Sequence, residues 1–371
     1  MLEEKIPWST PDISVDEEKA ISETLASKWL GMGPKTRELE KNICEYVGVK
    51  NSVVMNNGTS SLIAALIANG IKPGDKVLVP TYTFIATINS VLAIGAKPLL
   101  VDCDPTTFNV TIDGIKEVFE HDKDACCLIF VDVAGLPADI DLMRQFSHKN
   151  KIKLIEDAAE AFGARYKDKV LGNYDHTTIF SFHIAKQMTM IEGGAVVTND
   201  QQIADKLRLI RSHGEGKEKY IHTEFGLNLR PTDLQSAIGI AQLRKVEDYM
   251  NRRKRIAELY MSNLSQFLEF QFIPSYVGRH PWMLFMCLAK EKSIRDSLNS
   301  FLNERGIDTR IPWPPANLQP YHKARLGYIK CPNAESIYDR VLSLPIGNAV
   351  SETQAHKVIE VVKSFFEQGI N

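Results

Sequence analysis

Short apolar runs and longer amphipathic stretches alternate along the chain from residue 52 to residue 240. The apolar runs are rich in Val, Ile and Leu and show little alternation with polar residues, which is typical of strands covered on both faces. They predict seven strands at 52–55, 76–80, 98–102, 126–132, 152–156, 177–182 and 194–198, with helices between them such as 60–68 and 201–211. This order predicts an α/β fold, a mainly parallel seven-stranded sheet flanked by helices.

The pattern changes after Asp233, where apolar residues at helical spacing begin a helix that continues with many charges toward Glu258. We interpret this helix as the connection between two domains. Candidate elements at 270–273, 282–288, 293–305 and 358–366 then predict a smaller α+β domain. The expected division is a large domain over 1–245, which includes the N-terminal segment, and a linking helix with the small domain over 246–371.

Composition is that of an ordinary soluble globular protein, with 371 residues, 44% of them hydrophobic and 24% charged. A formal net charge of -2 provides no general basic field for nucleic acid. No run approaches the ~18 apolar residues of a spanning helix, so no membrane partner is expected. Met1 to Lys5 lack the basic and apolar pattern of a signal peptide, and we expect a cytoplasmic protein.

The cysteines and histidines indicate no metal site. Six cysteines show no C-x-x-C spacing, and nine histidines form no i, i+4 pair and stand beside no cysteine at zinc-ligand spacing. We expect reduced, structural thiols and no bound metal.

A lysine and an aspartate follow two of the predicted strands. Lys186 comes shortly after strand 177–182, and Asp157 comes directly after strand 152–156. Ligands of open α/β sheets collect at the carboxyl ends of strands. An amine there can bind an aldehyde cofactor covalently, and a carboxylate can keep a pyridine nitrogen protonated. The pair predicts pyridoxal 5'-phosphate, although a lysine alone is more typical of a surface charge and an aspartate at this position can also serve as a helix cap.

Two further segments follow strands. Gly58, Thr59 and Ser60 open a helix, where backbone N–H groups and hydroxyls favour a phosphate, but the same residues are typical of an ordinary turn and cap. Phe84 follows strand 76–80 and can stack on a flat cofactor, or it can be a core residue under a loop.

The ordered motifs resemble the DegT/DnrJ/StrS family of sugar aminotransferases, which have the fold-type I architecture of pyridoxal-phosphate enzymes. They include NGTSSL from Asn57, PTYTFIAT from Pro80, EDAAEAFG from Glu156, SFHIAK from Ser181, EGGA from Glu192, RSHG from Arg211 and GLNLR from Gly226. The resemblance runs from Trp29 to Ile346.

This resemblance implies roles for matching positions. Lys186 would carry the cofactor, Asp157 would contact its ring nitrogen and Phe84 would stack on the ring. The phosphate would bind to Thr59, Ser60 and Ser181, and Glu160 would approach the ring hydroxyl. Asn228 would reach the phosphate of the partner subunit, which implies a homodimer with active sites at the subunit interface.

The implied reaction transfers an amino group from L-glutamate to a nucleotide-linked 4-keto-6-deoxy sugar. Glu160 in the Asp-Ala-Ala-Glu position favours amination at C4 over C3, and Trp282-Met283 resembles a segment of perosamine synthases. The nucleotide, GDP, UDP or dTDP, stays open, as does the pathway, for polysaccharide, glycan or secondary metabolite.

Three residues are candidates for binding the substrate. His183 and Arg230 could contact the sugar or its diphosphate, or could serve the dimer interface or the core. Asn317 stands where many members carry a histidine that faces the substrate, and Ile191 replaces the first glycine of Gly-Glu-Gly-Gly.

Two other functions are alternatives to an aminotransferase. The related sugar dehydratases carry a histidine in place of the cofactor lysine, which Lys186 disfavours. A non-enzymatic regulator would need a DNA-reading or partner-reading extension.

Overall fold

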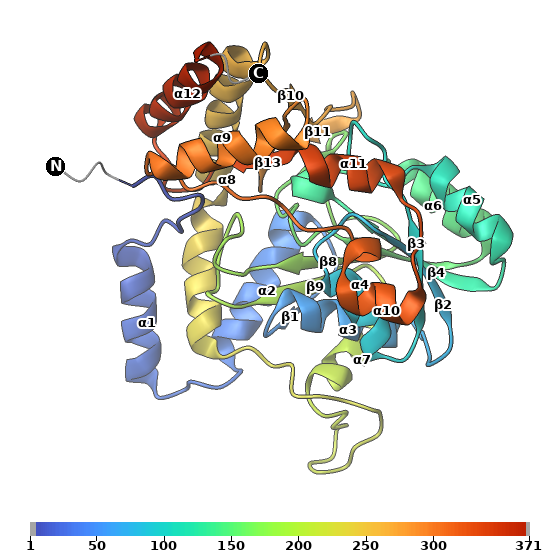
Figure 1. Cartoon of the computed structure of the whole chain (residues 1–371). Helices are drawn as coiled ribbons and strands as arrows, with labels where there is room; N and C mark the ends of the chain where they lie inside the picture. Colours follow the sequence, from blue (N-terminus) through green and yellow to red (C-terminus); the bar gives the residue numbers. More distant parts are fainter. Residues whose placement is uncertain (1–4, 369–371) are drawn as a thin grey trace.

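A seven-stranded sheet forms the centre of the computed structural model, which describes residues 5–368 (Figure 1). Met1 to Glu4, most of the stretch tested for a signal peptide, lie outside the described residues. In spatial order the strands are β1 (Asn51–Met55), β9 (Gly194–Thr198), β8 (Thr177–Ser181), β5 (Lys153–Asp157), β4 (Ala125–Val131), β2 (Lys76–Pro80) and β3 (Lys97–Val101). The prediction of a mainly parallel sheet is confirmed, and all seven strands lie within two residues of their expected bounds. The exception to parallel order is β9, which runs antiparallel to both β1 and β8.

Helices cover both faces of this sheet because successive strand residues point to opposite sides. Val54 belongs to a core with α2, α5, α6 and the first half of α8, whereas its neighbour Val53 belongs to a core with α3, α4 and α7. These helices are α2 (Pro34–Val47), α3 (Gly58–Ala68), α4 (Ala86–Ala93), α5 (Ile112–His121), α6 (Ile140–Asn150), α7 (Gln201–Arg211) and α8 (Asp233–Leu264). Helix α1 (Val15–Ser27) lies beside α8 at the outside of the molecule (Figure 1).

The hydrophobic core changes along α8. Met250 still packs with the residues of the central sheet, whereas Ile256 packs with the C-terminal elements. Around this second core lie β10 (Glu269–Phe270), β12 (Phe285–Leu288), β13 (Val341–Leu344), α9 (Lys292–Glu304) and α12 (Glu352–Glu367). Ile6 also belongs to it, and its N–H donates to the carbonyl of Gly306 over 2.8 Å. The first described residues therefore pack against the C-terminal part, although the expected division groups them with the large domain.

The remaining elements are short. The strands β10, β12 and β13 form one three-stranded sheet, and β11 (Val277–Arg279), β6 (Arg165–Tyr166) and β7 (Lys169–Val170) form another. The helical segments η1 (Val133–Gly135), η2 (Ala316–Leu318), α10 (Pro320–Leu326) and α11 (Pro332–Arg340) complete the chain. Within residues 5–368, none of the helices has both the length and the apolar character that crossing a membrane requires.

Candidate active site

The candidate residues gather at the carboxyl ends of the parallel strands. Asp157 ends β5 and Ser181 ends the neighbouring β8. Gly58 begins α3 shortly after β1 ends, and β9 begins between β1 and β8, with Gly194 opposite both Met55 and Ser181. The topology thus brings segments that are far apart in the sequence together at the carboxyl ends of the parallel strands.

Asp157 is buried without a charged hydrogen-bond partner. Its Oδ2 accepts from the Thr87 hydroxyl over 2.7 Å, and its Oδ1 accepts from the Ala159 N–H over 3.2 Å. Burial raises the pKa of this carboxyl to about 6, although both hydrogen bonds and the nearby Lys186 amine oppose the rise. A cationic group beside Asp157 would restore its charged form, which is what a protonated ring nitrogen supplies.

Lys186 lies in the turn after β8, and its amine approaches Glu160. The Nζ atom is 3.2 Å from Glu160 Oε1, with the two side chains 14% and 7% exposed. The other carboxylate oxygen of Glu160 accepts from the Ala134 N–H over 2.9 Å. The amine is therefore largely sheltered from water and held beside the end of β5.

The start of α3 lies against the end of β8. A Cβ atom on Gly58 would come within 2.9 Å of Ser181 Cβ, so glycine permits this close approach. Asn57 caps the helix by accepting from the Ser60 N–H over 2.8 Å. Ser60 is buried and Thr59 is exposed at the same helix end. A helix N-terminus with hydroxyls beside it suits an anionic group such as a phosphate.

Phe84 is 54% exposed, although it follows β2, an inner strand that lies between β4 and the edge strand β3. Its ring meets the edge of Trp313, with ring centroids 6.4 Å apart. Its carbonyl accepts from the Thr87 hydroxyl over 3.2 Å, so the turn with Phe84 is tied to the residue that also contacts Asp157. Thr87 and Trp313 are absent from the sequence-based candidates. Thr87 lies in the first turn of α4, four residues after Thr83, and this spacing was the available signal for Thr87, whereas Trp313 carried none.

Together these groups fit a flat heteroaromatic cation that carries an anion. The carboxylate of Asp157, the exposed ring of Phe84, the Lys186 amine and the start of α3 present the chemistry that a pyridine ring with an aldehyde and a phosphate requires. The fit rests on Asp157, a buried acid that has no cationic hydrogen-bond partner within the described chain.

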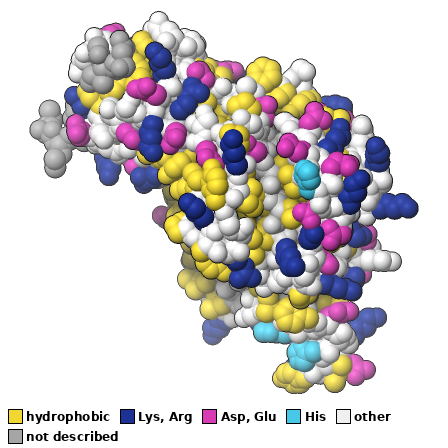
Figure 2. Space-filling model, turned by 45° about the vertical axis from the view of Figure 1, so that its right-hand side comes forward, with side chains coloured by type: hydrophobic (Ala, Val, Ile, Leu, Met, Phe, Trp, Pro, Cys, Tyr) yellow, Lys and Arg dark blue, Asp and Glu magenta, His cyan; other side chains and the backbone are white. Residues whose placement is uncertain are grey.

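Asn228 and Arg230 lie at the end of an outlying segment. Residues 212–228 extend from the sheet at the bottom of Figure 1, and Asn228 is exposed. Figure 2 shows histidine and hydrophobic side chains together at this end of the molecule. Arg230 Nη2 lies 3.3 Å from His213 Nε2. These contacts do not bring the two residues to Lys186 within one chain.

The other two candidate substrate contacts differ in exposure. His183 is exposed, and its Nε2 lies 3.7 Å from Glu192 Oε1. Asn317 is only 1% exposed, and its amide nitrogen donates to the Ile329 carbonyl and to Glu335, over 2.9 and 2.7 Å. Asn317 thus stabilises a loop, and a direct contact with substrate stays a prediction.

Ile191 adopts a left-handed conformation, with φ of 69°. Glycine populates this region freely, whereas a β-branched residue is strained there. The turn after Lys186 thus keeps the backbone shape that a glycine would favour.

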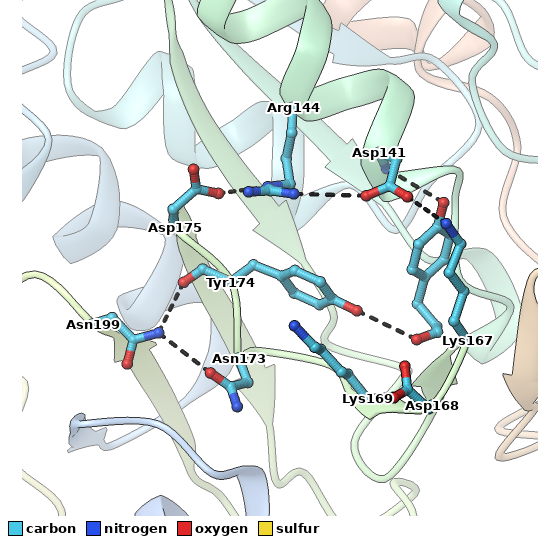
Figure 3. Close-up of a pocket in the computed structure, with 10 residues that line it drawn as sticks. Asp141, Arg144, Lys167, Asp168, Lys169, Asn173, Tyr174, Asp175 and Asn199 are labelled. Carbon is cyan, nitrogen blue, oxygen red and sulfur yellow. Dashed lines mark hydrogen bonds and ion pairs between the residues drawn. The ribbon is translucent and has the colours of Figure 1, made fainter.

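A separate surface hollow of about 420 Å³ lies at the other end of the sheet, where the parallel strands begin (Figure 3). Its lining includes Asp175, shortly before β8, and Asn199, just after the antiparallel β9. Four of its charged side chains pair with one another, Arg144 with Asp175 over 2.5 Å and Lys167 with Asp141 over 2.6 Å. None of the candidate residues lines it. Within residues 5–368, no cluster of three or more His, Cys, Asp or Glu could hold a metal.

Proteins similar to this chain in sequence and fold include sugar aminotransferases. A model of the DegT/DnrJ/EryC1/StrS aminotransferase family matches residues 11–363. The structure of S. venezuelae DesV is 32% identical with a TM-score of 0.90, and the match covers 95% of each chain. Helicobacter pylori PseC, an aminotransferase involved in pseudoaminic acid biosynthesis, is 25% identical with a TM-score of 0.93 over 98% of this chain and all of PseC (100%). The PLP-form of Spr1654, a putative sugar aminotransferase from Streptococcus pneumoniae, is 25% identical with a TM-score of 0.91 over 99% of this chain and 100% of that one.

Proposed function

Because the chain belongs to the DegT/DnrJ/EryC1/StrS aminotransferase family, we propose that it transfers an amino group from L-glutamate to C4 of a nucleotide-linked 4-keto-6-deoxy sugar. The chain is a pyridoxal-phosphate-dependent enzyme of the sugar aminotransferase class. The observation that carries the proposal is the approach of the Lys186 amine to Glu160 beside the buried, uncompensated Asp157.

The residues at the strand ends would hold the cofactor. Gly58, Thr59, Ser60 and Ser181 would bind its phosphate, and Phe84 would cover its ring. When bound, pyridoxal phosphate supplies an aldehyde that binds amines and a ring that withdraws electrons from the adjacent carbon. Asp157 would hold a proton on the ring nitrogen and so preserve this electron demand.

The Lys186 amine would perform two tasks. At rest it would bind the cofactor covalently. Once released, it would move a proton between Cα of the amino donor and the aldehyde carbon of the cofactor. Glu160, 3.2 Å from the amine, would keep the amine on this side of the site. The same proton transfer in the opposite direction would complete amination of the keto sugar.

Reductive trapping tests the role of Lys186. Borohydride should fix the cofactor to the peptide that contains Lys186, and Lys186→Ala should remain folded and bind cofactor while losing turnover by more than about 10³-fold. A label on another lysine, or turnover by Lys186→Ala, would contradict the assignment.

The choice of C4 rests on Glu160 in the Asp-Ala-Ala-Glu position; the alternative is amination at C3 by the same chemistry. Trp282 adds little to this choice, because it is buried and stacks on His280 with ring centroids 3.9 Å apart. His183 and Arg230 remain the proposed contacts to the sugar or diphosphate. Glutamate-dependent amination of a panel of 4-keto and 3-keto GDP, UDP and dTDP sugars would decide, and conversion of 3-keto sugars alone would overturn the C4 proposal. The product would serve polysaccharide or glycan synthesis in the cytoplasm, where the six free thiols would stay reduced.

The proposed assembly is a homodimer in which Asn228 completes the partner's site. Support comes from the exposed side chains near Asn228, including Tyr220 at 74% and Phe225 at 62% exposure. Large exposed apolar groups of this kind are typical of an interface.

Subunit complementation tests this assembly. Lys186→Ala and Asn228→Ala homodimers should both be impaired, but unfolding and refolding them together should restore up to about a quarter of the sites, since each mixed dimer has one intact site. Monomeric protein at micromolar concentration, or no recovery on mixing, would refute shared sites.

A further inference from the structure

Arg253 is a buried cation without an anion. It lies in the second half of α8, is 1% exposed, and is paired with no carboxylate in the part of the chain that the structure describes. Desolvation lowers its pKa to about 10. Its Nε donates to Asn348 Oδ1 over 2.8 Å, and its Nη1 donates to the carbonyls of Trp282 and Met283 over 2.8 and 3.3 Å. Burying a guanidinium whose hydrogen-bond acceptors are all neutral carries a desolvation penalty in folding free energy, so a functional reason for its contacts is sought in the residues that they connect.

One set of contacts leads from Arg253 to the backbone beside Lys186. Asn348 accepts from Arg253 and donates through Nδ2 to the carbonyl of Gln187 over 2.8 Å. The side-chain amide of Gln187 in turn donates to the carbonyl of Glu160. Asn348 and Gln187 are both buried, which shields these hydrogen bonds from water.

A second set leads from Arg253 to the carboxylate that faces the amine. The N–H of Met283, whose carbonyl accepts from Arg253, donates to the carbonyl of Ala134 over 3.0 Å. The Ala134 N–H donates to Glu160 Oε2, and Glu160 Oε1 faces the Lys186 amine. Both sets of contacts therefore end at the Lys186 and Glu160 pair.

We infer that Arg253, through Asn348 and Met283, is a positioning residue that fixes the Lys186 turn and Glu160 relative to the C-terminal part of the chain. The inference rests on the proposed role of Lys186. Arginine suits this task because its planar fork holds donors on separate nitrogens at fixed angles and so reaches acceptors on two segments, whereas a lysine carries all its donors on one nitrogen. Small displacements of a reacting group cost large factors in rate, so loss of this support should appear in kcat.

Asn348→Asp separates positioning from stability. Aspartate keeps an acceptor for Arg253 Nε and gives the guanidinium an anion, but it loses the donor to the Gln187 carbonyl. We expect the variant to melt at or above the wild-type temperature, with kcat reduced about tenfold or more at little change in KM for glutamate. Hydrogen exchange in the peptide 183–190 should be faster in both cofactor-free and cofactor-loaded protein.

Arg253→Lys is compared with Arg295→Lys as a matched control. Arg295 is also buried, at 3% exposure, and donates to the carbonyls of Tyr338 and Val341 over 2.8 and 3.1 Å. Unlike Arg253 it also pairs with a carboxylate, Asp296, over 2.6 Å, and none of these contacts leads to Lys186. Both changes should lower the melting temperature. Only Arg253→Lys should speed exchange in 183–190 and reduce kcat about tenfold.

Wild-type kcat and unchanged exchange in Asn348→Asp would overturn the inference, as would equal effects of the two arginine changes on exchange in 183–190. Exchange is measured without substrate, so it tests the positioning role even if borohydride labels another lysine. That labelling result would refute the proposed function alone.

Discussion

Two adjacent carboxylates of β5, Glu156 and Asp157, are both buried but point to opposite faces of the sheet. Glu156 faces the side of α6, where it accepts from the Thr178 hydroxyl over 2.7 Å and lies 3.1 Å from His176 Nε2. Asp157 faces the side of α4 and accepts from the Thr87 hydroxyl, also over 2.7 Å. Exposure alone does not distinguish them, since Glu156 is 0% and Asp157 is 3% exposed.

Their surroundings differ in what remains to be satisfied. Glu156 has a third neighbour, Asp132. Burial, and after it the charge of Glu156, raises the pKa of Asp132 well above its usual range. A side-chain hydrogen bond with Glu156 contributes to this rise, so the two buried carboxyls can share a proton, and the chain itself supplies a neighbour for each of them. Asp157 has neutral donors and a pKa of about 6, with an amine nearby and an exposed aromatic ring on the adjoining turn. A buried acid thus becomes a functional candidate when its environment calls for a partner that the chain does not supply.

The largest expected difference between the two faces is in turnover. Asp157→Asn should lower kcat by about 10²-fold or more, because a neutral amide cannot keep the ring nitrogen protonated. Glu156→Gln should keep kcat within about threefold of wild type, because its amide can donate to Asp132 in place of the shared proton. Steady-state kinetics with glutamate measures both, and similar losses in the two variants would remove the distinction.

The second difference concerns stability and pH in the cofactor-free protein. The pKa of Asp157 is about 6 in the folded state and ~3.9 unfolded. A raised pKa contributes stability below the unfolded value that is lost as pH rises through the folded value. Relative to Asp157→Asn, the wild type should therefore lose about 2 kcal/mol of unfolding free energy between pH 4 and pH 7. Urea denaturation at several pH values measures this loss, and a constant difference would show that Asp157 titrates normally.

The smallest expected difference comes from the threonines that support each carboxylate. Thr87→Val removes a hydrogen bond that lowers the Asp157 pKa, and we expect kcat to fall about fivefold, the equivalent of one hydrogen bond. Thr178→Val removes the matching bond to Glu156 and should reduce stability by about 1 kcal/mol with kcat unchanged. Equal effects on kcat would show that both faces act in catalysis.

The sheet could be predicted from the sequence because strands buried on both faces leave continuous apolar runs. Helix α7 was predicted with its observed bounds, and α8 was placed at its start but ends at Leu264, beyond the expected Glu258. The antiparallel direction of β9 could not be predicted, because an apolar run carries no direction. The two- and three-residue strands β6, β7 and β11 are too short to show a period.

The site was predictable to the extent that its residues follow strands. Asp157 and Phe84 lie where their positions after apolar runs indicated, whereas Ser181 was a candidate only through the family resemblance. Contacts between side chains distant in sequence were not predictable, such as Thr87 with Asp157 or Arg253 with Asn348. The buried position of Asn317 was also hidden, because its partners come from the folded loops around it.

The antiparallel direction of β9 limits the positions that the backbone of Lys186 can adopt. The chain leaves β8 at Ser181 and re-enters the sheet at Gly194 on the same edge, and Phe182 and Gly193 are joined by a hydrogen bond of 2.8 Å at the base. Lys186 therefore lies in a loop whose two ends are fixed in adjacent strands. A parallel strand would instead require a long crossover connection. The distance that its amine can cover therefore depends on the four methylenes of its side chain. Replacing Lys186 by ornithine, which has one methylene fewer, would test whether a shorter side chain still places the amine correctly.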